Sequence, residues 1–221
     1  MGIYRFDVFR TPNIGVFLKA NEEFILVPRG LAKTKEEKLK NYLKVESVRV
    51  DIAGTRLLGP LVCMNNRGIV LPRTAEDDEV RILKEETGLV VERFPSKYNC
   101  VGNLVVANDK GAIASDMLGP EDVAFLKDVL DVPIEQATIA SYRHVGSVVF
   151  ASDKAALIHP SASEEEVELV REVLKVEVEP VTVNGGVSFV SSGILANSKG
   201  VVVGSLTTPI ELMILSKLFG L

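Results

Sequence analysis

The segment formed by residues 101–140 reads VGNLVVANDKGAIASDMLGPEDVAFLKDVLDVPIEQATIA. It begins with two short apolar runs, at residues 104–107 and 112–114, on either side of the turn Asn108-Asp109-Lys110-Gly111. Asn and Asp close such turns through side-chain bonds to the backbone, and Gly accepts a positive φ. We therefore predict a β-hairpin of two buried strands in this part of the segment.

A helix and a further strand are predicted in the rest of the segment. Pro120 suits the first turn of a helix, because its missing N–H would have no partner there in any case. Apolar residues follow it at helical spacing: Val123, Leu126, Val129 and Leu130. Residues 132–139 then have the character of an outgoing strand, so the segment encodes one ββαβ unit.

This unit occurs five times along the chain. The small residue at the second position of each copy recurs at intervals of 43 to 45 residues: Gly15, Gly59, Gly102, Gly146 and Ser191. Six residues further on, a turn begins in every copy: Asn21, Asn65, Asn108, Ser152 and Asn197. The first copy fits least well, since Phe24 stands where the other turns end in Gly or Ala. Repeats of this length indicate an array of supersecondary units.

The other copies also carry signals for the start of a helix. Ser163 and Glu166 form a capping box in the fourth copy. Thr208, Pro209 and Glu211 mark the start of the fifth helix. Outgoing strands are predicted at residues 45–50, 89–94, 132–139 and 176–183.

The fifth copy lacks an outgoing strand, because the sequence ends after its helix at Leu221. Residues 4–9 alternate in polarity as a strand does, and we expect them to complete the fifth unit. No sheet edge would then be left unpaired at this place. The prediction is an α/β fold, a single domain over residues 1–221 in which five pseudo-symmetric units close into a ring. The repeats cover residues 13–56, 57–99, 100–143 and 144–187, and the fifth combines residues 188–221 with residues 1–12.

The composition is that of a globular protein whose surface as a whole has little affinity for polyanions. Charged residues make up 25% of the 221 residues and the net charge is −5, whereas affinity for phosphates comes from Lys and Arg. No apolar run reaches the ~18 residues of a membrane span. Residues 1–9 lack the continuous apolar core of a signal peptide. We therefore expect a cytoplasmic protein.

The sequence gives no support for a metal or cofactor site. The two cysteines, Cys63 and Cys100, belong to no Cys-x-x-Cys motif, and we expect both to be buried free thiols. The two histidines, His144 and His159, have no companion ligand four residues further on. The glycines form no nucleotide-binding motif. We expect no catalytic, metal or cofactor residues.

Several short strings, taken in order, resemble one known family. They are residues 13–16 (NIGV), 101–104 (VGNL), 108–111 (NDKG), 144–147 (HVGS), 158–160 (IHP), 195–200 (LANSKG) and 207–212 (TTPIEL). Their order and spacing over essentially the whole chain resemble the translation initiation factor 6 family, and the end soon after the fifth helix resembles its archaeal form. The resemblance implies the pentein fold, an α/β-propeller of five ββαβ units.

The resemblance also implies a ribosomal role rather than an enzymatic one. Members of the family bind the large ribosomal subunit on its subunit-joining face, where they contact ribosomal protein uL14 and lie near the sarcin–ricin loop. While bound, they prevent premature association with the small subunit, and they take part in large-subunit maturation and translation initiation. No cofactor is implied, and we expect a monomer.

The family's contact surface lies at one end of the ring and uses the residue after the small second residue of each repeat. The equivalent positions in this chain are Val16, Pro60, Asn103, Ser147 and Ser192. Asn103 matches the asparagine of the family's Gly-Asn pair, so we expect its amide to face the polar backbone of the partner. The alternative is that the Asn103 side chain only satisfies its own loop.

One of these positions departs from the family. Pro60 stands where eukaryotic relatives carry an arginine, so no charge-assisted contact is expected from it. Arg56 and Arg143 are the candidates to supply such a contact, although ordinary solvated arginines would explain both.

Two other functions stay open at this point. Pentein hydrolases and transferases that modify guanidino compounds use a nucleophilic cysteine late in the chain, with a histidine and carboxylates. Here the last cysteine is Cys100, in the third copy, and neither His144 nor His159 has a cysteine partner by register. A Cys–His pair in an axial pocket would favour the enzyme. The remaining function is that of a scaffold protein that binds another partner through the same rim.

Overall fold

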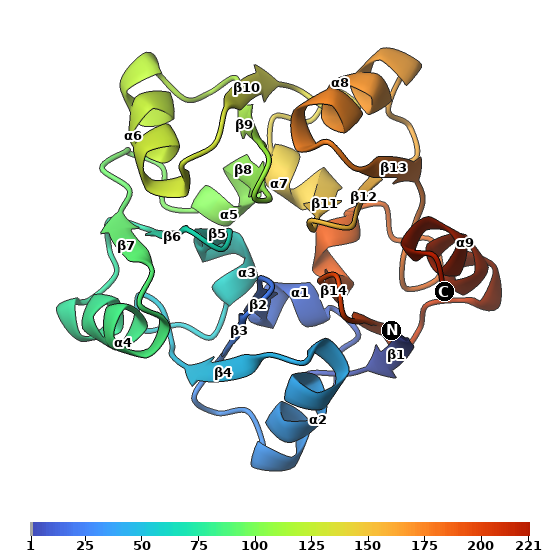
Figure 1. The fold of residues 1–221 in the computed structure, drawn as a ribbon, viewed down its shortest axis with the longest axis horizontal. Coiled ribbons are helices and arrows are strands. Elements are labelled where there is room, and N and C mark those ends of the chain that lie inside the picture. The colour runs from blue at the N-terminus through green and yellow to red at the C-terminus, as the bar shows by residue number, and fades with distance from the viewer. Residues whose placement is uncertain (1) are drawn as a thin grey trace.

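The computed structural model describes residues 2–221. Its strands form five separate three-stranded sheets, which lie around a common centre, each with one helix on the outside (Figure 1). Every unit consists of a one-turn inner helix, a hairpin, an outer helix and a returning strand. The mixed α/β class, the five copies and their order along the chain agree with the repeat in the sequence.

The second strand of each hairpin is the central strand of its sheet. It pairs antiparallel with the strand before it and parallel with the strand after the outer helix. The sheets are β2 (Lys19–Ala20), β3 (Phe24–Val27) and β4 (Glu46–Arg49); β5 (Cys63–Met64), β6 (Gly68–Leu71) and β7 (Val90–Arg93); β8 (Val105–Ala107), β9 (Ala112–Ser115) and β10 (Ile134–Ala137); β11 (Val149–Ala151), β12 (Ala155–Ile158) and β13 (Glu177–Pro180); and β14 (Ile194–Ala196), β15 (Val201–Gly204) and β1 (Ile3–Phe6).

The helices form an inner and an outer set. The outer helices are 11 residues long: α2 (Lys33–Leu43), α4 (Asp77–Thr87), α6 (Pro120–Leu130), α8 (Glu164–Leu174) and α9 (Pro209–Phe219). The inner helices are single turns: α1 (Ile14–Phe17), α3 (Leu58–Leu61), α5 (Val101–Leu104), α7 (Val145–Val148) and the 3₁₀ turn η1 (Val190–Ser192). The capping box predicted at Ser163 and Glu166 is confirmed, with both reciprocal hydrogen bonds present.

The inner helices correct one expectation about the hairpins. The first apolar run of each copy was predicted as a strand, but its beginning forms part of an inner helix, so Leu61 and Leu104 are helical and the first strands have only two or three residues. Close packing of the inner helices on one another explains the difference. A Cβ atom on Gly102 would lie 2.0 Å from the carbonyl oxygen of Gly59 and would clash with it. Only glycine, which has no Cβ atom, fits at this position.

The N-terminal strand lies in the fifth sheet, as the missing fifth strand predicts. β1 pairs in parallel with β15, and the backbone N–H of Val201 donates to the Gly2 carbonyl at 3.0 Å. The ring of Tyr4 stacks on that of Tyr42 in α2, with centroids 3.9 Å apart. The strand is shorter than predicted and ends at Phe6, because the chain then turns through Phe9 and Arg10, which both have positive φ.

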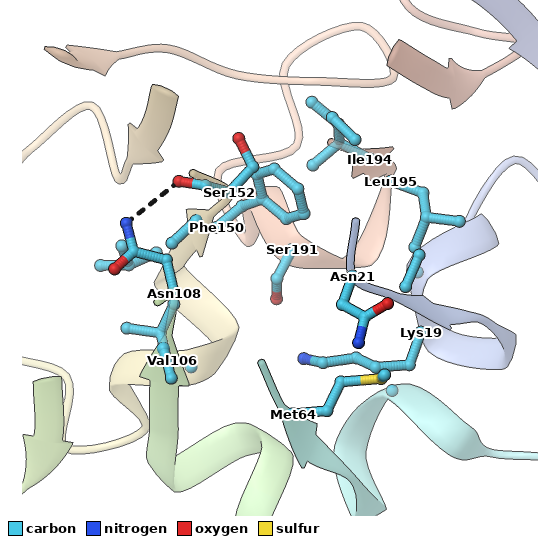
Figure 2. A pocket seen from close by; sticks show the side chains of 18 of the residues that line it. Lys19, Asn21, Met64, Val106, Asn108, Phe150, Ser152, Ser191, Ile194 and Leu195 are labelled. Carbon is cyan, nitrogen blue, oxygen red and sulfur yellow. Dashed lines mark hydrogen bonds between the residues drawn. The ribbon is translucent and has the colours of Figure 1, made fainter. Parts of the chain in front are cut away.

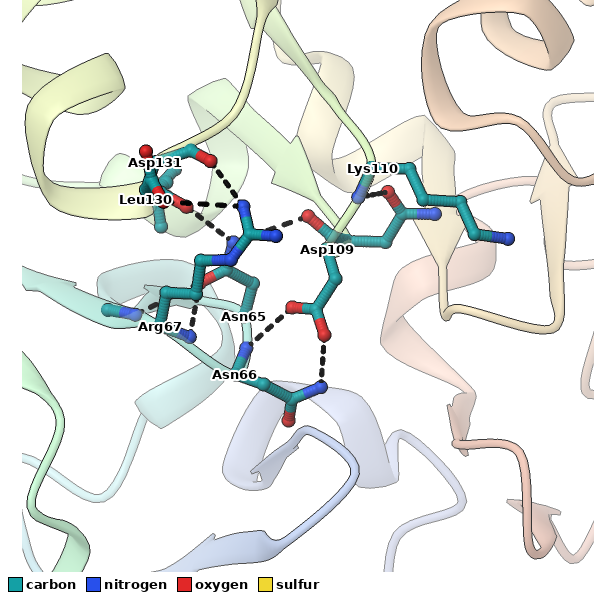
Figure 3. Close-up of polar contacts among 9 residues, drawn as sticks. Asn65, Asn66, Arg67, Asp109, Lys110, Leu130 and Asp131 are labelled. Carbon is teal, nitrogen blue, oxygen red and sulfur yellow. Dashed lines mark hydrogen bonds and ion pairs between the residues drawn. The ribbon is translucent and has the colours of Figure 1, made fainter.

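The turn asparagines of four units connect each of these units to the next. Asn65 accepts hydrogen bonds from the backbone N–H groups of Arg67 and Gly68, which closes its own turn. Its amide nitrogen donates to the carbonyls of Asn108 and Leu130 in the following unit, at 3.3 and 2.8 Å (Figure 3). The side chain is thereby saturated, which explains why an asparagine rather than a generic turn residue recurs here.

Candidate functional site

The five positions predicted to contact the partner all line one cavity at the centre of the molecule. Its volume is about 280 Å³, and residues from all five units form its wall. Val16, Pro60, Asn103, Ser147 and Ser192 each lie in the inner helix of their own unit. The structure therefore brings together residues that are far apart in the sequence, while their role in binding stays a prediction.

Contacts between the inner helices place these residues side by side. A Cβ atom on Gly59 would lie only 1.9 Å from the carbonyl oxygen of Gly15. A Cβ atom on Gly146 would likewise lie 2.2 Å from the carbonyl oxygen of Gly102. The Ser191 hydroxyl donates to the Ser147 carbonyl at 2.9 Å. Such close backbone approach leaves the inner helices little freedom to move relative to one another.

Asn103 lines the cavity and has a side-chain amide without a hydrogen bond to residues 2–221. Its backbone N–H donates to the Cys100 carbonyl at 3.0 Å, as part of the inner helix. Its side-chain amide forms no hydrogen bond within residues 2–221, and the residue is partly buried. The side chain does not serve to satisfy its own loop, so both its donor and its acceptor are available to a partner.

The side chains of the other four predicted residues have fewer free hydrogen-bonding groups than the Asn103 amide. The Ser192 hydroxyl is engaged, because it donates to the Phe189 carbonyl at 2.7 Å. Ser147 gives its carbonyl to the neighbouring unit. Val16 and Pro60 add partly buried apolar surface. Among the five, the Asn103 amide and the Ser147 hydroxyl are therefore the side-chain groups without a hydrogen bond to residues 2–221, and the amide offers both a donor and an acceptor.

Three exposed apolar side chains near the inner helices are missing from the predicted set. Leu57, Tyr142 and Phe189 are 43, 38 and 42% exposed, and each lies shortly before an inner helix. The rings of Tyr142 and Phe189 are 5.2 Å apart, and the ring of the buried His159 lies 5.3 Å from that of Tyr142. A large apolar residue in a turn just before the small repeat residue is the signal that would have identified them.

Basic residues also gather in the turns that lead into the inner helices. Arg10, Arg56, Lys97 and Arg143 are all exposed there. Arg56 lies over the ring of Phe9 at 5.3 Å. Arg143 forms an ion pair with Asp116 at 2.7 Å, so its charge is partly compensated. These turns are locally basic although the whole chain carries a net charge of −5.

The wall of the cavity mixes apolar and polar side chains (Figure 2), and its charged groups are one cation, Lys19, and two carboxylates, Glu22 and Asp153. Met64, Val106, Phe150 and Leu195 contribute apolar surface, and Lys19 extends into the same space. Burial lowers the pKa of the Lys19 ammonium, and the charge of neighbouring Cys63 offsets part of this effect.

Turn residues beside the cavity are joined by a chain of hydrogen bonds. The backbone N–H of Asn66 donates to Asp109, and that of Asp109 donates to Asp153, at 2.9 and 2.8 Å. Glu22 accepts from Ser198 in the same manner. Burial, together with the charges of Asp109 and Glu22, raises the pKa of the Asp153 carboxyl, and the hydrogen bond from Asp109 lowers it in part.

The arrangement needed for guanidino chemistry is not found among the described residues. No Cys or His side chain lines the central cavity. Cys63 is buried beside it, and burial raises the pKa of its thiol to about 11, which keeps the thiolate scarce at neutral pH. Cys100 is exposed rather than buried, so the expectation of two buried thiols is wrong; it caps the short helix α5 instead of filling the core.

No cluster of His, Cys, Asp and Glu within residues 2–221 has a geometry that would hold a metal ion. Over the same residues, none of the helices combines the length and the apolar character that crossing a membrane requires.

Comparison with solved structures concerns the fold. A crystal structure of a dimethylarginine dimethylaminohydrolase variant, an adduct with S-methyl-L-thiocitrulline, superposes with a TM-score of 0.51 at 17% identity. The match covers 80% of this chain and 74% of that chain. The likeness shows a shared pentein-like fold alone.

Comparison of sequences concerns the family. A relative titled "Translation initiation factor 6" from Nitrosopumilus maritimus is 54% identical over 99% of both chains. Proteins of the same title from Cenarchaeum symbiosum and Saccharolobus solfataricus are 48 and 38% identical, over at least 99% of each chain. The family model described as "eIF-6 family" matches residues 3–218. The chain therefore belongs to the eIF-6 family.

Proposed function

We propose that this protein is a translation initiation factor that binds the large ribosomal subunit on its subunit-joining face and prevents premature association with the small subunit. The observation that carries the proposal is full-length similarity to archaeal proteins titled "Translation initiation factor 6". The convergence of Val16, Pro60, Asn103, Ser147 and Ser192 around one cavity supports it, because these are the positions that the family resemblance assigns to the contact.

We infer further that the five units form one closed ring. Three outer helices pack against the central strand of the unit before them. A Cβ atom on the glycine at, or just before, the start of that strand would lie within 2.2 Å of a carbonyl oxygen in the helix. The pairs are Gly68 with Val129, Gly111 with Val173, and Gly200 with Tyr42. The last of these contacts joins the first unit to the fifth. A closed ring would act as a rigid disc, and a disc on the joining face blocks the small subunit by occupying its place.

The surface chemistry around the inner helices suits a mixed protein and RNA partner. Leu57, Tyr142 and Phe189 offer apolar and aromatic contact area, which dominates protein interfaces. The free amide of Asn103 lines the same cavity as Phe189 and would face ribosomal protein uL14 in this proposal. Exposed arginines such as Arg56 would meet phosphates near the sarcin–ricin loop.

The protein would act in the cytoplasm as a monomer, without a cofactor, and would take part in large-subunit maturation as well as in initiation. Occlusion requires only a stable shape and a binding face. Within residues 2–221, no Cys–His pair of the kind that an enzyme of this fold would use lines the central cavity.

Sedimentation with purified archaeal ribosomal subunits tests the proposal directly. The protein is mixed with large subunits, with small subunits, or with neither, and each sample is centrifuged through a sucrose gradient. We expect co-migration with the large subunit at one copy per particle, and none with the small subunit. Migration with the small subunit only, or with neither subunit, would refute the proposal.

A further inference from the structure

One charged residue occupies a position of the repeat that is otherwise apolar. Lys19 lies four residues after Gly15, and the equivalent residues in the other units are Cys63, Val106, Phe150 and Leu195. All four of these side chains are uncharged and pack in the core or along the cavity wall. Neither the fold nor the inner-helix contacts require a cation at this place.

Lys19 also lacks an internal partner. Its ammonium group forms no ion pair and no hydrogen bond with residues 2–221, although it extends into the central cavity (Figure 2). Two carboxylates line the same cavity and neither pairs with Lys19, since Glu22 accepts from Ser198 and Asp153 accepts from Asp109. A partly buried ammonium without a partner has lost some of its hydration, and an anion in the cavity would offset that loss.

The shape and lining of the cavity indicate what kind of anion fits. Its volume of about 280 Å³ is close to the lower limit of small-molecule sites. Most of its wall is apolar, from Met64, Val106 and Phe150. The turn asparagines are saturated by backbone hydrogen bonds and add no free donor, whereas the Asn103 amide is free.

We propose that the central cavity is a binding site for a small organic anion, a carboxylate or phosphate with an apolar body, whose charged group pairs with Lys19. The apolar body would lie against Met64, Val106 and Phe150, and the Asn103 amide would close the polar side. The site shares Asn103 with the proposed ribosomal contact, but its charged group, Lys19, and its apolar wall belong to none of the five contact positions.

Calorimetric titration with matched probes tests this site. Benzoate carries both the charge and the apolar body, benzamide carries the body without the charge, and inorganic phosphate carries the charge without the body. We expect benzoate to bind more tightly than either of the other two. In parallel, carbon-13 NMR of lysine labelled at Cε should show that saturating benzoate raises the pKa of Lys19, because a bound carboxylate favours the charged ammonium.

Substitutions at Lys19 separate the specific site from general adsorption. Lys19→Met keeps the length of the side chain and removes its charge, and we expect it to weaken benzoate binding roughly 10- to 100-fold. Lys38→Met makes the same change on the exposed face of α2 and should leave binding unchanged. The melting temperature of each variant, measured without ligand, shows whether it is folded.

Two results would overturn the proposal. One is equal affinity of folded wild-type and Lys19→Met protein for benzoate, which would place the anion elsewhere on the molecule. The other is the absence of any benzoate signal in the calorimeter together with an unchanged Lys19 pKa in the NMR titration. Either outcome would leave Lys19 as a hydrated lysine in a solvent-filled cavity.

Discussion

At the scale of single residues, Glu211 shows how the outer helices hold the turns before the inner helices. Its carboxylate accepts hydrogen bonds from the backbone N–H groups of Gly185, Gly186 and Thr208, and from the hydroxyl of Thr182 at 2.6 Å. Burial by itself would raise the pKa of the Glu211 carboxyl, but these bonds outweigh it and lower the pKa to about 2.

The lowered pKa predicts how stability depends on pH. In the folded state the pKa of Glu211 lies below its ordinary value of 4.5, so the contribution is fully present above pH 4.5 and is lost as the pH falls toward about 2. We expect Glu211→Gln to lower the free energy of unfolding at pH 7 by on the order of 2 kcal/mol. Urea denaturation at several pH values measures the effect.

The matched control for that change is Glu165→Gln, at an exposed position in the first turn of α8. It should alter the free energy of unfolding at pH 7 by less than about 0.5 kcal/mol. If both variants lose stability equally, or if the wild type and Glu211→Gln have parallel pH profiles below pH 4.5, the hydrogen-bonded carboxylate of Glu211 is not the source of the pH dependence.

Replacing Asn103 should weaken binding to the large subunit without destabilising the fold. Asn103→Arg places a long cation beside the cavity and should weaken binding to the large subunit about tenfold or more, since the amide is lost from a close contact. Because the side chain has no internal hydrogen bond, the melting temperature should change by less than about 2 °C. Asn41→Arg, on the exposed face of α2, is the control that should bind normally. A large loss of stability would assign Asn103 to the fold.

At the scale of elements, the packing of the inner helices gives a sharp prediction. A Cβ on Gly102 would meet two backbone carbonyls, those of Gly59 at 2.0 Å and Val62 at 2.7 Å, and neither can move aside as a flexible side chain would. We expect Gly102→Ala to lower the free energy of unfolding by roughly 3 kcal/mol or more. Thermal or urea unfolding of the purified variant provides the measurement.

Gly119 supplies the comparison for that change, because nothing lies within 4 Å of its Cβ position and its φ is negative. Gly119→Ala should cost less than about 1 kcal/mol, the usual range for a helix N-cap. Equal stability of the two alanine variants would show that the inner helices do not depend on close backbone contact.

The sequence allowed most of the elements to be predicted, but not the inner helices. Hairpins, outer helices and the returning strands follow from local signals such as the Asn/Gly turns and the capping box at Ser163. The inner helices arise from tertiary packing between units, and a run such as residues 61–64 has the same apolar character whether it forms a strand or ends a helix.

The candidate site was predicted only in part, for a similar reason. The register of the repeat placed Asn103 and its four equivalents together, and they do line one cavity. The aromatic pair of Tyr142 and Phe189 was missed, because the exposure of a side chain depends on the surrounding fold and not on its type. Lys19 was missed as well, although aligning the repeats shows it as a charge among apolar equivalents.

At the scale of the whole molecule, the pairing of β1 with β15 links the two ends of the chain. A variant that lacks residues 1–6 would expose the edge of β15 and lose the buried Phe6 and the stack of Tyr4 on Tyr42. We expect it to lose roughly 3 kcal/mol or more of stability and to associate through the open edge. Unfolding curves and size-exclusion chromatography report the two effects.

The opposite truncation is the control for the ends of the chain. Removing residues 220–221 takes away no strand, since α9 ends at Phe219, and should shift the melting temperature by less than about 3 °C. A chain without residues 1–6 that unfolds like the full-length protein and stays monomeric would contradict the closure of the ring through β1.

Whether this molecule acts by occlusion is measured most directly by light scattering during subunit joining. Purified archaeal large subunits are incubated with increasing amounts of the protein, small subunits are added, and the scattering of the joined ribosome is recorded. We expect joining to fall in proportion to the protein added and to be abolished at one copy per large subunit, while the same amount of Asn103→Arg leaves joining largely intact. Full joining on large subunits already saturated with the wild-type protein would contradict it.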